Sequence, residues 1–202
     1  MAKWVDRLLE LTGWDEPRWE CDWGETEAEL GVSLPSDYKE LCARFGPGIF
    51  AEDYLTVLAD QRAGRDSLLR WWRGFVRIHE NGAHSTEWML GPHKVFGING
   101  RSGVIPWAHA APDGVLFWLA DAAVDPGSWP IIGKYELALD EEWHRFDMPA
   151  SEFVYRALTD TEFRPFSLER WGEGEDVPRT FWRLIMEALA LSRCGLGIEF
   201  RT

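Results

Sequence analysis

The chain has no long hydrophobic segment and very few cysteines. Within its 202 residues there is no apolar run of about 18 residues, the length that a membrane-spanning helix requires. The first residues carry Asp6 and Glu10 inside their apolar pattern, which is not typical of a signal peptide. The three cysteines are widely spaced and form no C-x-x-C pair: Cys21, Cys42 and Cys194. We therefore expect a cytoplasmic protein with reduced thiols and no contact with membranes.

Motifs of catalysis and metal binding are also missing. The five histidines form neither H-x-H nor H-E-x-x-H, and no other ligands cluster around them as a zinc site requires. There is no G-x-S-x-G nucleophile motif. The glycines of residues 96–100 lie between two predicted strands, whereas a phosphate-binding loop opens a helix. The sequence predicts no metal, no cofactor and no enzymatic activity.

Positive charge is in short supply, and the formal net charge is −13. Residues 10–40 hold ten acids and two bases, and residues 111–150 hold eight acids and two bases, whereas residues 60–101 carry a net charge of +3. Strong acidity opposes binding to nucleic acid or to anionic membranes, and favours a basic protein partner. The alternative is that the acidic surface only keeps the protein soluble.

Aromatic residues, in contrast, are abundant. The thirteen tryptophans are expected mostly in the core, since each has a large apolar area to bury. The clearest single element is a helix over residues 34–45, with Pro35 in its first turn and Gly46 as a left-handed cap at its end. Helical spacing and strand patterns together predict seven buried residues: Tyr38, Leu41, Phe45, Trp107, Trp118, Phe153 and Leu158.

The remaining pattern indicates an α+β fold. Further helices are expected over residues 3–11, 25–30, 63–79 and 149–158. Strands are expected over residues 54–58, 95–98, 104–110, 115–120 and 129–133, with one more in 134–146. Because their connections are short, the strands from residue 94 to 146 should form an antiparallel meander flanked by helices. Residues 161–202 are expected to be a C-terminal extension whose helix, 178–192, packs on the same domain.

Several short motifs occur in an order and spacing that resemble the SUKH superfamily, named after the Smi and Knr regulators of yeast cell-wall assembly. The matching residues are Trp4, Leu30-Gly31, Leu34-Pro35, Asp37-Tyr38-Lys39, Phe45-Gly46 and Gly48, followed by the stretches 104–121, 128–132 and 148–158. The resemblance covers residues 1–160, which are expected to form the SUKH-like domain.

This resemblance implies an α+β domain that binds proteins and has no enzymatic activity. Bacterial members of the superfamily are typically immunity proteins, which neutralise toxins that are in many cases nucleases. Such toxins are often basic because they bind phosphates, so an acidic inhibitor would be attracted to them. The alternative is an intracellular adaptor or regulator of the Smi/Knr type, which acts on an endogenous protein.

The second acidic region is the predicted partner-binding surface. Several of its acids lie in or beside predicted turns, where side chains are exposed, and two nearby tryptophans would supply apolar anchors. The predicted residues are Asp113, Asp121, Asp125, Asp140, Glu141, Glu142, Trp129 and Trp143. For Asp113 and Asp125, a purely local role in the turn is the alternative.

Overall fold

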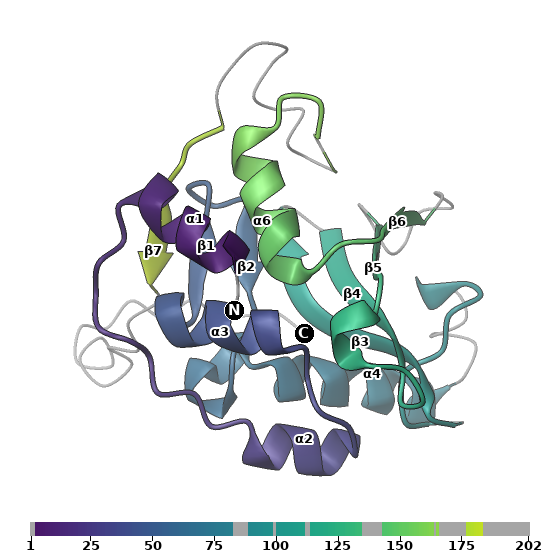
Figure 1. Ribbon diagram of the computed structural model, residues 1–202. Coiled ribbons are helices and arrows are strands. Elements are labelled where there is room, and N and C mark those ends of the chain that lie inside the picture. Colours follow the sequence, from purple (N-terminus) through teal and green to yellow (C-terminus); the bar gives the residue numbers. More distant parts are fainter. Residues whose placement is uncertain are drawn as a thin grey trace, which may run out of the picture.

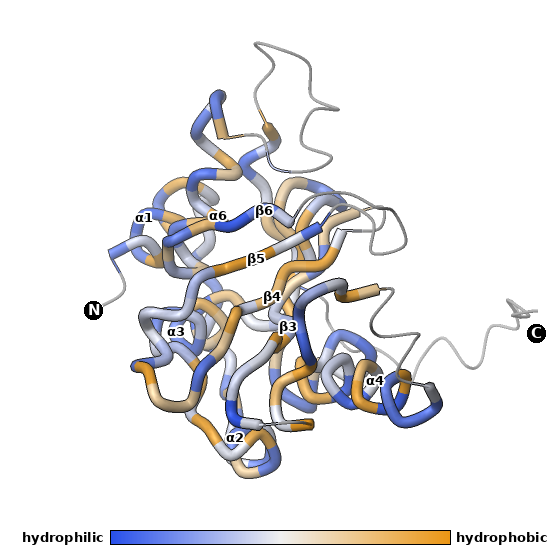
Figure 2. The backbone as a smooth tube through the Cα atoms, turned by 90° about the vertical axis from the view of Figure 1, so that its right-hand side faces the viewer, coloured by the Kyte–Doolittle hydropathy of each residue, from blue (hydrophilic) through white to orange (hydrophobic). Residues whose placement is uncertain are grey.

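A seven-stranded antiparallel sheet runs through the middle of the protein, with helices on both faces (Figures 1 and 2). The computed structural model describes residues 3–82, 89–98, 100–111, 114–134, 143–163, 165 and 177–183. In Figure 2, α1, α3 and α6 lie on one side of the sheet and α4 lies on the other. The α+β class is therefore confirmed.

Five α-helices and two short 3₁₀ segments lie in the described part of the chain. They are α1 (Lys3–Thr12), α2 (Gly24–Leu30), α3 (Ser36–Phe45), α4 (Leu68–Asn81) and α6 (Ala150–Thr159), with η1 (Gln61–Asp66) and η2 (Pro126–Ser128). All five α-helices were expected from the sequence. Among the described residues, no helix combines the length and the apolar character needed to cross a bilayer.

The strand order is β6-β5-β4-β3-β2-β1-β7, and every neighbouring pair is antiparallel. The strands are β1 (Gly48–Phe50), β2 (Leu55–Val57), β3 (Ser102–Ala110), β4 (Gly114–Asp121), β5 (Ile131–Lys134), β6 (His144–Phe146) and β7 (Phe181–Arg183). The predicted meander corresponds to β3–β6 and is confirmed. The strand predicted over residues 54–58 forms as β2, and the sheet is wider than predicted because β1 and β7 extend it further.

The main core lies between the sheet and α3. All seven residues predicted to be buried are buried, and the Cys42 side chain packs beside them. The Tyr38 hydroxyl donates a hydrogen bond to the Leu58 carbonyl, and its ring meets the Trp118 ring edge-on at 4.7 Å. Trp107 reaches this core through a β-bulge next to Pro106, which has no N–H to donate to a sheet ladder.

The backbone that follows α3 explains why both glycines of the motif Phe45-Gly46-Pro47-Gly48 are required. Gly46 has a positive φ of 78°, but its ψ of −170° is not that of the expected left-handed helical cap. Gly48 has no space for a side chain, since an added Cβ would lie 2.1 Å from the Phe181 ring of β7. Both glycines therefore let the chain enter β1 directly beside β7.

The predicted helix over residues 178–192 is wrong at its start. Residues 181–183 form β7, which pairs with β1 at the edge of the sheet (Figure 1), and residues 184–192 lie outside the described part of the chain. Phe181 is buried against Phe45 at a ring separation of 4.8 Å, whereas Trp182 is 63% exposed. This alternation of one buried and one exposed side chain is typical of a strand.

Two smaller differences concern the segment before β3 and helix α1. Residues 95–98 were expected to be a strand, but only Val95 forms an isolated parallel bridge with Val104, followed by a turn. In α1, Val5 and Leu8 are the buried residues, and Trp4 lies half-buried against Tyr155. The sequence spacing predicts that Trp4, Leu8 and Leu11 share the buried face, so the helix is rotated slightly from this prediction.

Candidate functional site

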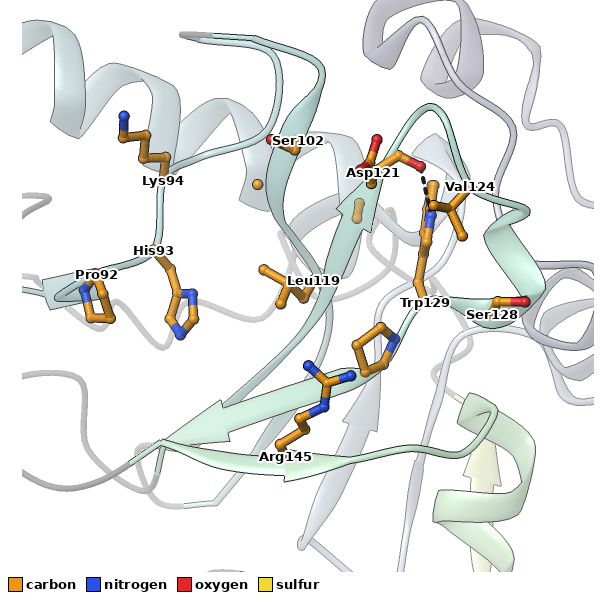
Figure 3. A pocket seen from close by; sticks show the side chains of 13 residues that line it. Pro92, His93, Lys94, Ser102, Leu119, Asp121, Val124, Ser128, Trp129 and Arg145 are labelled. Atoms are coloured by element: carbon orange, nitrogen blue, oxygen red, sulfur yellow. Dashed lines mark hydrogen bonds between the residues drawn. The ribbon is translucent and has the colours of Figure 1, made fainter.

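A groove of about 550 Å³ lies beside the loop that joins β4 to β5 (Figure 3). We call it the β4–β5 groove. The chain segments that line it come from four places: the start of β3, the end of β4 with the following loop, β6, and the segment before β3. Its lining residues are Pro92, His93, Lys94, Ser102, Gly103, Leu119, Ala120, Asp121, Val124, Ser128, Trp129, Pro130 and Arg145.

Trp129 holds the loop wall of this groove in place. Its indole N–H donates a hydrogen bond of 3.0 Å to the backbone carbonyl of Asp121, as Figure 3 shows. Its ring lies 6.5 Å from that of Trp118, and the side chain is only 4% exposed. The two ends of the loop are thus tied together through a buried side chain, so the loop has a defined shape before any partner arrives.

The outer part of the loop presents an apolar side chain between two acids. Val124 is 45% exposed and is one of only two large hydrophobic side chains that are exposed in the described part of the chain. Asp121 accepts a hydrogen bond from the N–H of Ala123 at 2.9 Å, and Asp125 accepts one from Gly127 at 3.3 Å. These turn hydrogen bonds hold both carboxylates in place, and both aspartates are exposed to solvent, as is Val124, which lies between them in the sequence.

The opposite wall of the groove is polar. Gly103 has a φ of 151°, and an added Cβ would lie 2.5 Å from the Lys94 carbonyl, so glycine is what lets residues 93–94 lie against β3. Burial lowers the pKa of His93, whose ring meets Trp143 at 4.7 Å. Arg145 forms a 2.8 Å ion pair with Asp147. In Figure 3 the His93 ring and the Arg145 guanidinium point toward the hollow, while Lys94 points away.

The structure brings together three of the predicted partner-binding residues and places a fourth behind the groove. Asp121, Asp125 and Trp129 share the β4–β5 loop. Trp143 is half-buried and packs against His93 and Phe117, so it supports the wall of the groove. The other four predicted residues lie outside the described part of the chain: Asp113, Asp140, Glu141 and Glu142.

The role predicted for Trp129 is wrong. A side chain that is 4% exposed cannot act as an apolar anchor for a partner, because the core and the Asp121 carbonyl already occupy it. Val124, which the sequence analysis missed, is the exposed apolar side chain at this place. In the sequence, Val124 can be recognised as a branched apolar residue within the turn-forming stretch Asp121–Gly127. His93 and Arg145 were also missed, and neither belongs to a motif.

Within the described residues, several acidic side chains of residues 10–40, unlike those of the β4–β5 loop, form ion pairs with arginines of the same chain. Arg18 forms a bidentate pair with Glu40, with distances of 2.7 and 2.9 Å. Arg73 of α4 holds Glu25 and Glu29 of α2, and hydrogen bonding to Arg73 lowers the pKa of Glu29. These acids hold elements of the fold together, so a partner has less free charge to meet here than the sequence suggests.

The two described cysteines are poor nucleophiles. Burial raises the pKa of the Cys21 thiol to about 12 and that of Cys42 well above its usual value, so both thiols stay protonated at neutral pH. Within the described residues, no group of three or more His, Cys, Asp or Glu side chains is placed to hold a metal ion. Neither protein-family models, nor curated proteins, nor solved structures gave a match to this chain.

Proposed function

We propose that this chain is a non-enzymatic protein-binding module of the bacterial cytoplasm, and that it is an immunity protein. In this role it binds a basic toxin, such as a nuclease, and neutralises it. The observation that carries the proposal is the exposed Val124, which is flanked in the sequence by two exposed acids, Asp121 and Asp125, whose carboxylates are held by their own turns. The resemblance of residues 1–160 to the SUKH superfamily supplies the biological role.

Protein interfaces commonly have an apolar centre surrounded by a charged rim. The apolar side chain contributes binding energy when a partner covers it, and the rim charges select the partner and speed its approach. Both rim charges next to Val124 are negative, and the whole chain carries a net charge of −13. A partner with a positively charged surface, as a protein that grips phosphates requires, is complementary to such a loop.

The loop is also well suited to binding because its shape is already fixed. Trp129 ties its ends together, and the two aspartates cap its turns. A loop that is ordered before binding loses less conformational entropy on association, so more of the contact energy remains as affinity. The hollow of about 550 Å³ beside the loop leaves room for a side chain of the partner.

Site-specific cross-linking in the native host tests the proposal. A photo-reactive amino acid replaces Val124, and a matched variant carries it at Glu10, an exposed position on α1. We expect the probe at position 124, and not that at position 10, to capture a basic protein that mass spectrometry identifies. When that protein is expressed alone it should stop growth, and co-expression of the intact chain should restore growth.

Two outcomes would contradict the proposal. Equal capture from both positions, or from neither, would place the binding surface elsewhere. Capture of an endogenous protein that does not harm the cell would favour the alternative role, an adaptor or regulator of the Smi/Knr type.

A further inference from the structure

A second groove, of about 360 Å³, lies along α4, the helix that Figure 2 shows on the other side of the sheet from α3. We call it the α4 groove. Most of its lining comes from one face of α4, where residues 70–78 span about 12 Å of helix. Its lining residues are Arg65, Arg70, Trp71, Gly74, Phe75, Ile78, Met89 and Val115. It shares no residue with the β4–β5 groove.

The walls of the α4 groove are apolar and held firmly. The indole N–H of Trp71 donates a 3.1 Å hydrogen bond to the Arg65 carbonyl, and the ring stacks on that of His109 at 4.9 Å and 9°. Phe75 forms the floor and packs against Phe117 of β4 at 5.3 Å. Trp71 and Ile78 nevertheless remain partly exposed, so apolar surface faces solvent along the helix.

Gly74 gives the groove its depth. It lies in the interior of a fourteen-residue helix, where glycine is less stable than alanine by about 1 kcal/mol. Among the described residues nothing requires glycine here: its φ is not positive, and a built Cβ would have no heavy atom of theirs within 4 Å. The missing side chain thus weakens the helix and leaves an open floor between Trp71 and Ile78.

The rim of the groove is cationic on a protein that is acidic as a whole. Arg65 has 84% of its side chain exposed although it forms a 3.5 Å ion pair with Asp66, and Arg70 is exposed as well. Within the described part of the chain, no ion pair engages the Arg70 guanidinium, whereas Arg73, nearly one turn further on, is held by Glu25 and Glu29 of α2. Arg73 therefore stabilises the fold through its ion pairs, whereas Arg70 is exposed beside the apolar groove.

We infer that the α4 groove docks an acidic amphipathic segment of a partner protein. Apolar side chains of that segment lie over Gly74 between Trp71 and Ile78, and its carboxylates meet Arg65 and Arg70. This charge pattern is the opposite of the one at Val124, so the two surfaces accept different chemistry. The proposal does not depend on the immunity role, and either can fail alone.

A designed peptide provides the direct test. The first peptide is a fluorescein-labelled amphipathic helix with Leu at i, i+3, i+4 and i+7 and Glu at the other positions, called the Glu peptide. The control, called the Lys peptide, has Lys in place of every Glu. The net charge of the protein repels the Glu peptide and attracts the Lys peptide, so preferential binding of the Glu peptide reports a local site. We expect the Glu peptide to bind, and its affinity to fall as salt rises.

Variants of the groove then locate the site. Gly74→Leu fills the floor and should weaken binding of the Glu peptide at least about tenfold. Arg70→Glu should weaken it about threefold or more, while Arg77→Glu, the same charge change at an exposed position outside the lining, should have a smaller effect. Gly74→Ala should raise the thermal midpoint of unfolding. This result would show that the folded protein accepts a side chain at position 74.

Several results would overturn the inference. These are tighter binding of the Lys peptide, no binding of the Glu peptide, equal effects of Arg70→Glu and Arg77→Glu, and unchanged binding by a folded Gly74→Leu protein. Dodecanoate binding more tightly than the peptide would assign the groove to a lipid instead.

Discussion

Residues 10–40 and the β4–β5 loop are both acidic, but their carboxylates do different work. In the first region, Glu25, Glu29 and Glu40 are bound by arginines, and Asp37 of α3 accepts two hydrogen bonds of 3.1 Å from Ser151 at the start of α6. In the loop, and within the described part of the chain, the carboxylates of Asp121 and Asp125 accept hydrogen bonds only from backbone N–H groups of their own turns. The first group holds helices together, and the second leaves its charge facing solvent.

The comparison shows that a count of charges overstates what a partner can meet. The N-terminal region has the larger negative charge in the sequence, yet a large part of it is paired in the fold. The loop has fewer acids, and they flank an exposed apolar side chain. If the paired and the exposed acids have these different roles, substitutions of acids in the first region should affect stability, and substitutions of acids in the loop should affect binding.

The largest effect is expected at Asp37. Asp37→Ala removes the cap of α6 and leaves the Ser151 hydroxyl, which is 1% exposed, without its acceptor. The free energy of unfolding should fall by about 2 kcal/mol, as measured by urea denaturation. Asp121→Ala is the matched control and should lower it by less than about 1 kcal/mol. Equal losses would break the comparison.

The next effect concerns Val124 and the identified partner. Val124→Ser should weaken binding about tenfold because it removes the apolar centre of the loop. Stability should change by no more than about 0.5 kcal/mol, since the side chain is exposed. Ala123→Ser, at the neighbouring exposed position, should bind as the wild type does in calorimetry. A wild-type affinity for Val124→Ser would remove this residue from the interface.

The loop acids should act on the rate of association. The double variant Asp121→Asn and Asp125→Asn keeps an oxygen that can accept the turn hydrogen bonds, but it removes both charges. Association with the basic partner should slow by about three- to tenfold at low salt, with little change in dissociation. Surface plasmon resonance over a range of salt concentrations measures both rates. An unchanged association rate would show that these charges do not steer the partner.

The smallest effect is expected for Arg73 and depends on pH. The pKa of Glu29 is lowered in the folded state, so its ion pair stabilises the protein above the carboxyl's unfolded pKa of about 4.3. That contribution is lost as the pH falls through the lower folded pKa. Arg73→Met should therefore cost about 0.5 kcal/mol at pH 7, and the difference from the wild type should shrink at acid pH.

Arg77→Met provides the control for this measurement, because Arg77 lies one turn further along α4 and is exposed. It should show no such dependence on pH. A difference between Arg73→Met and the wild type that stays constant down to pH 3 would mean that Glu29 is not the partner that matters.

Local patterns were sufficient to predict most of the fold. The face of α3 and the strands β3–β5 follow from spacing and from turn residues, which depend on neighbours in the sequence. The start of the predicted C-terminal helix was wrong because Phe181 and Trp182 are compatible with either state. Their strand conformation depends on pairing with β1, which no local pattern reveals.

The candidate site was predictable only in part, for a similar reason. The acids at Asp121 and Asp125 could be found because turn residues surround them. Whether Trp129 or Val124 faces solvent depends on the hydrogen bond from Trp129 to Asp121 and on packing against Trp118. The wall opposite the loop is assembled from segments far apart in the sequence, so residues such as His93 and Arg145 give no combined signal.

The position of β7 also has a consequence for how the chain folds. Glu52, next to β1, donates its backbone N–H to the Thr180 hydroxyl, a contact across 128 residues of sequence. During synthesis β1 leaves the ribosome long before β7, so its outer edge stays unpaired and Phe50 lacks the Phe181 ring. An unpaired edge strand can pair with another chain. The nascent protein should therefore be most prone to aggregate before β7 is made, and closing this long-range contact should be a slow step of folding.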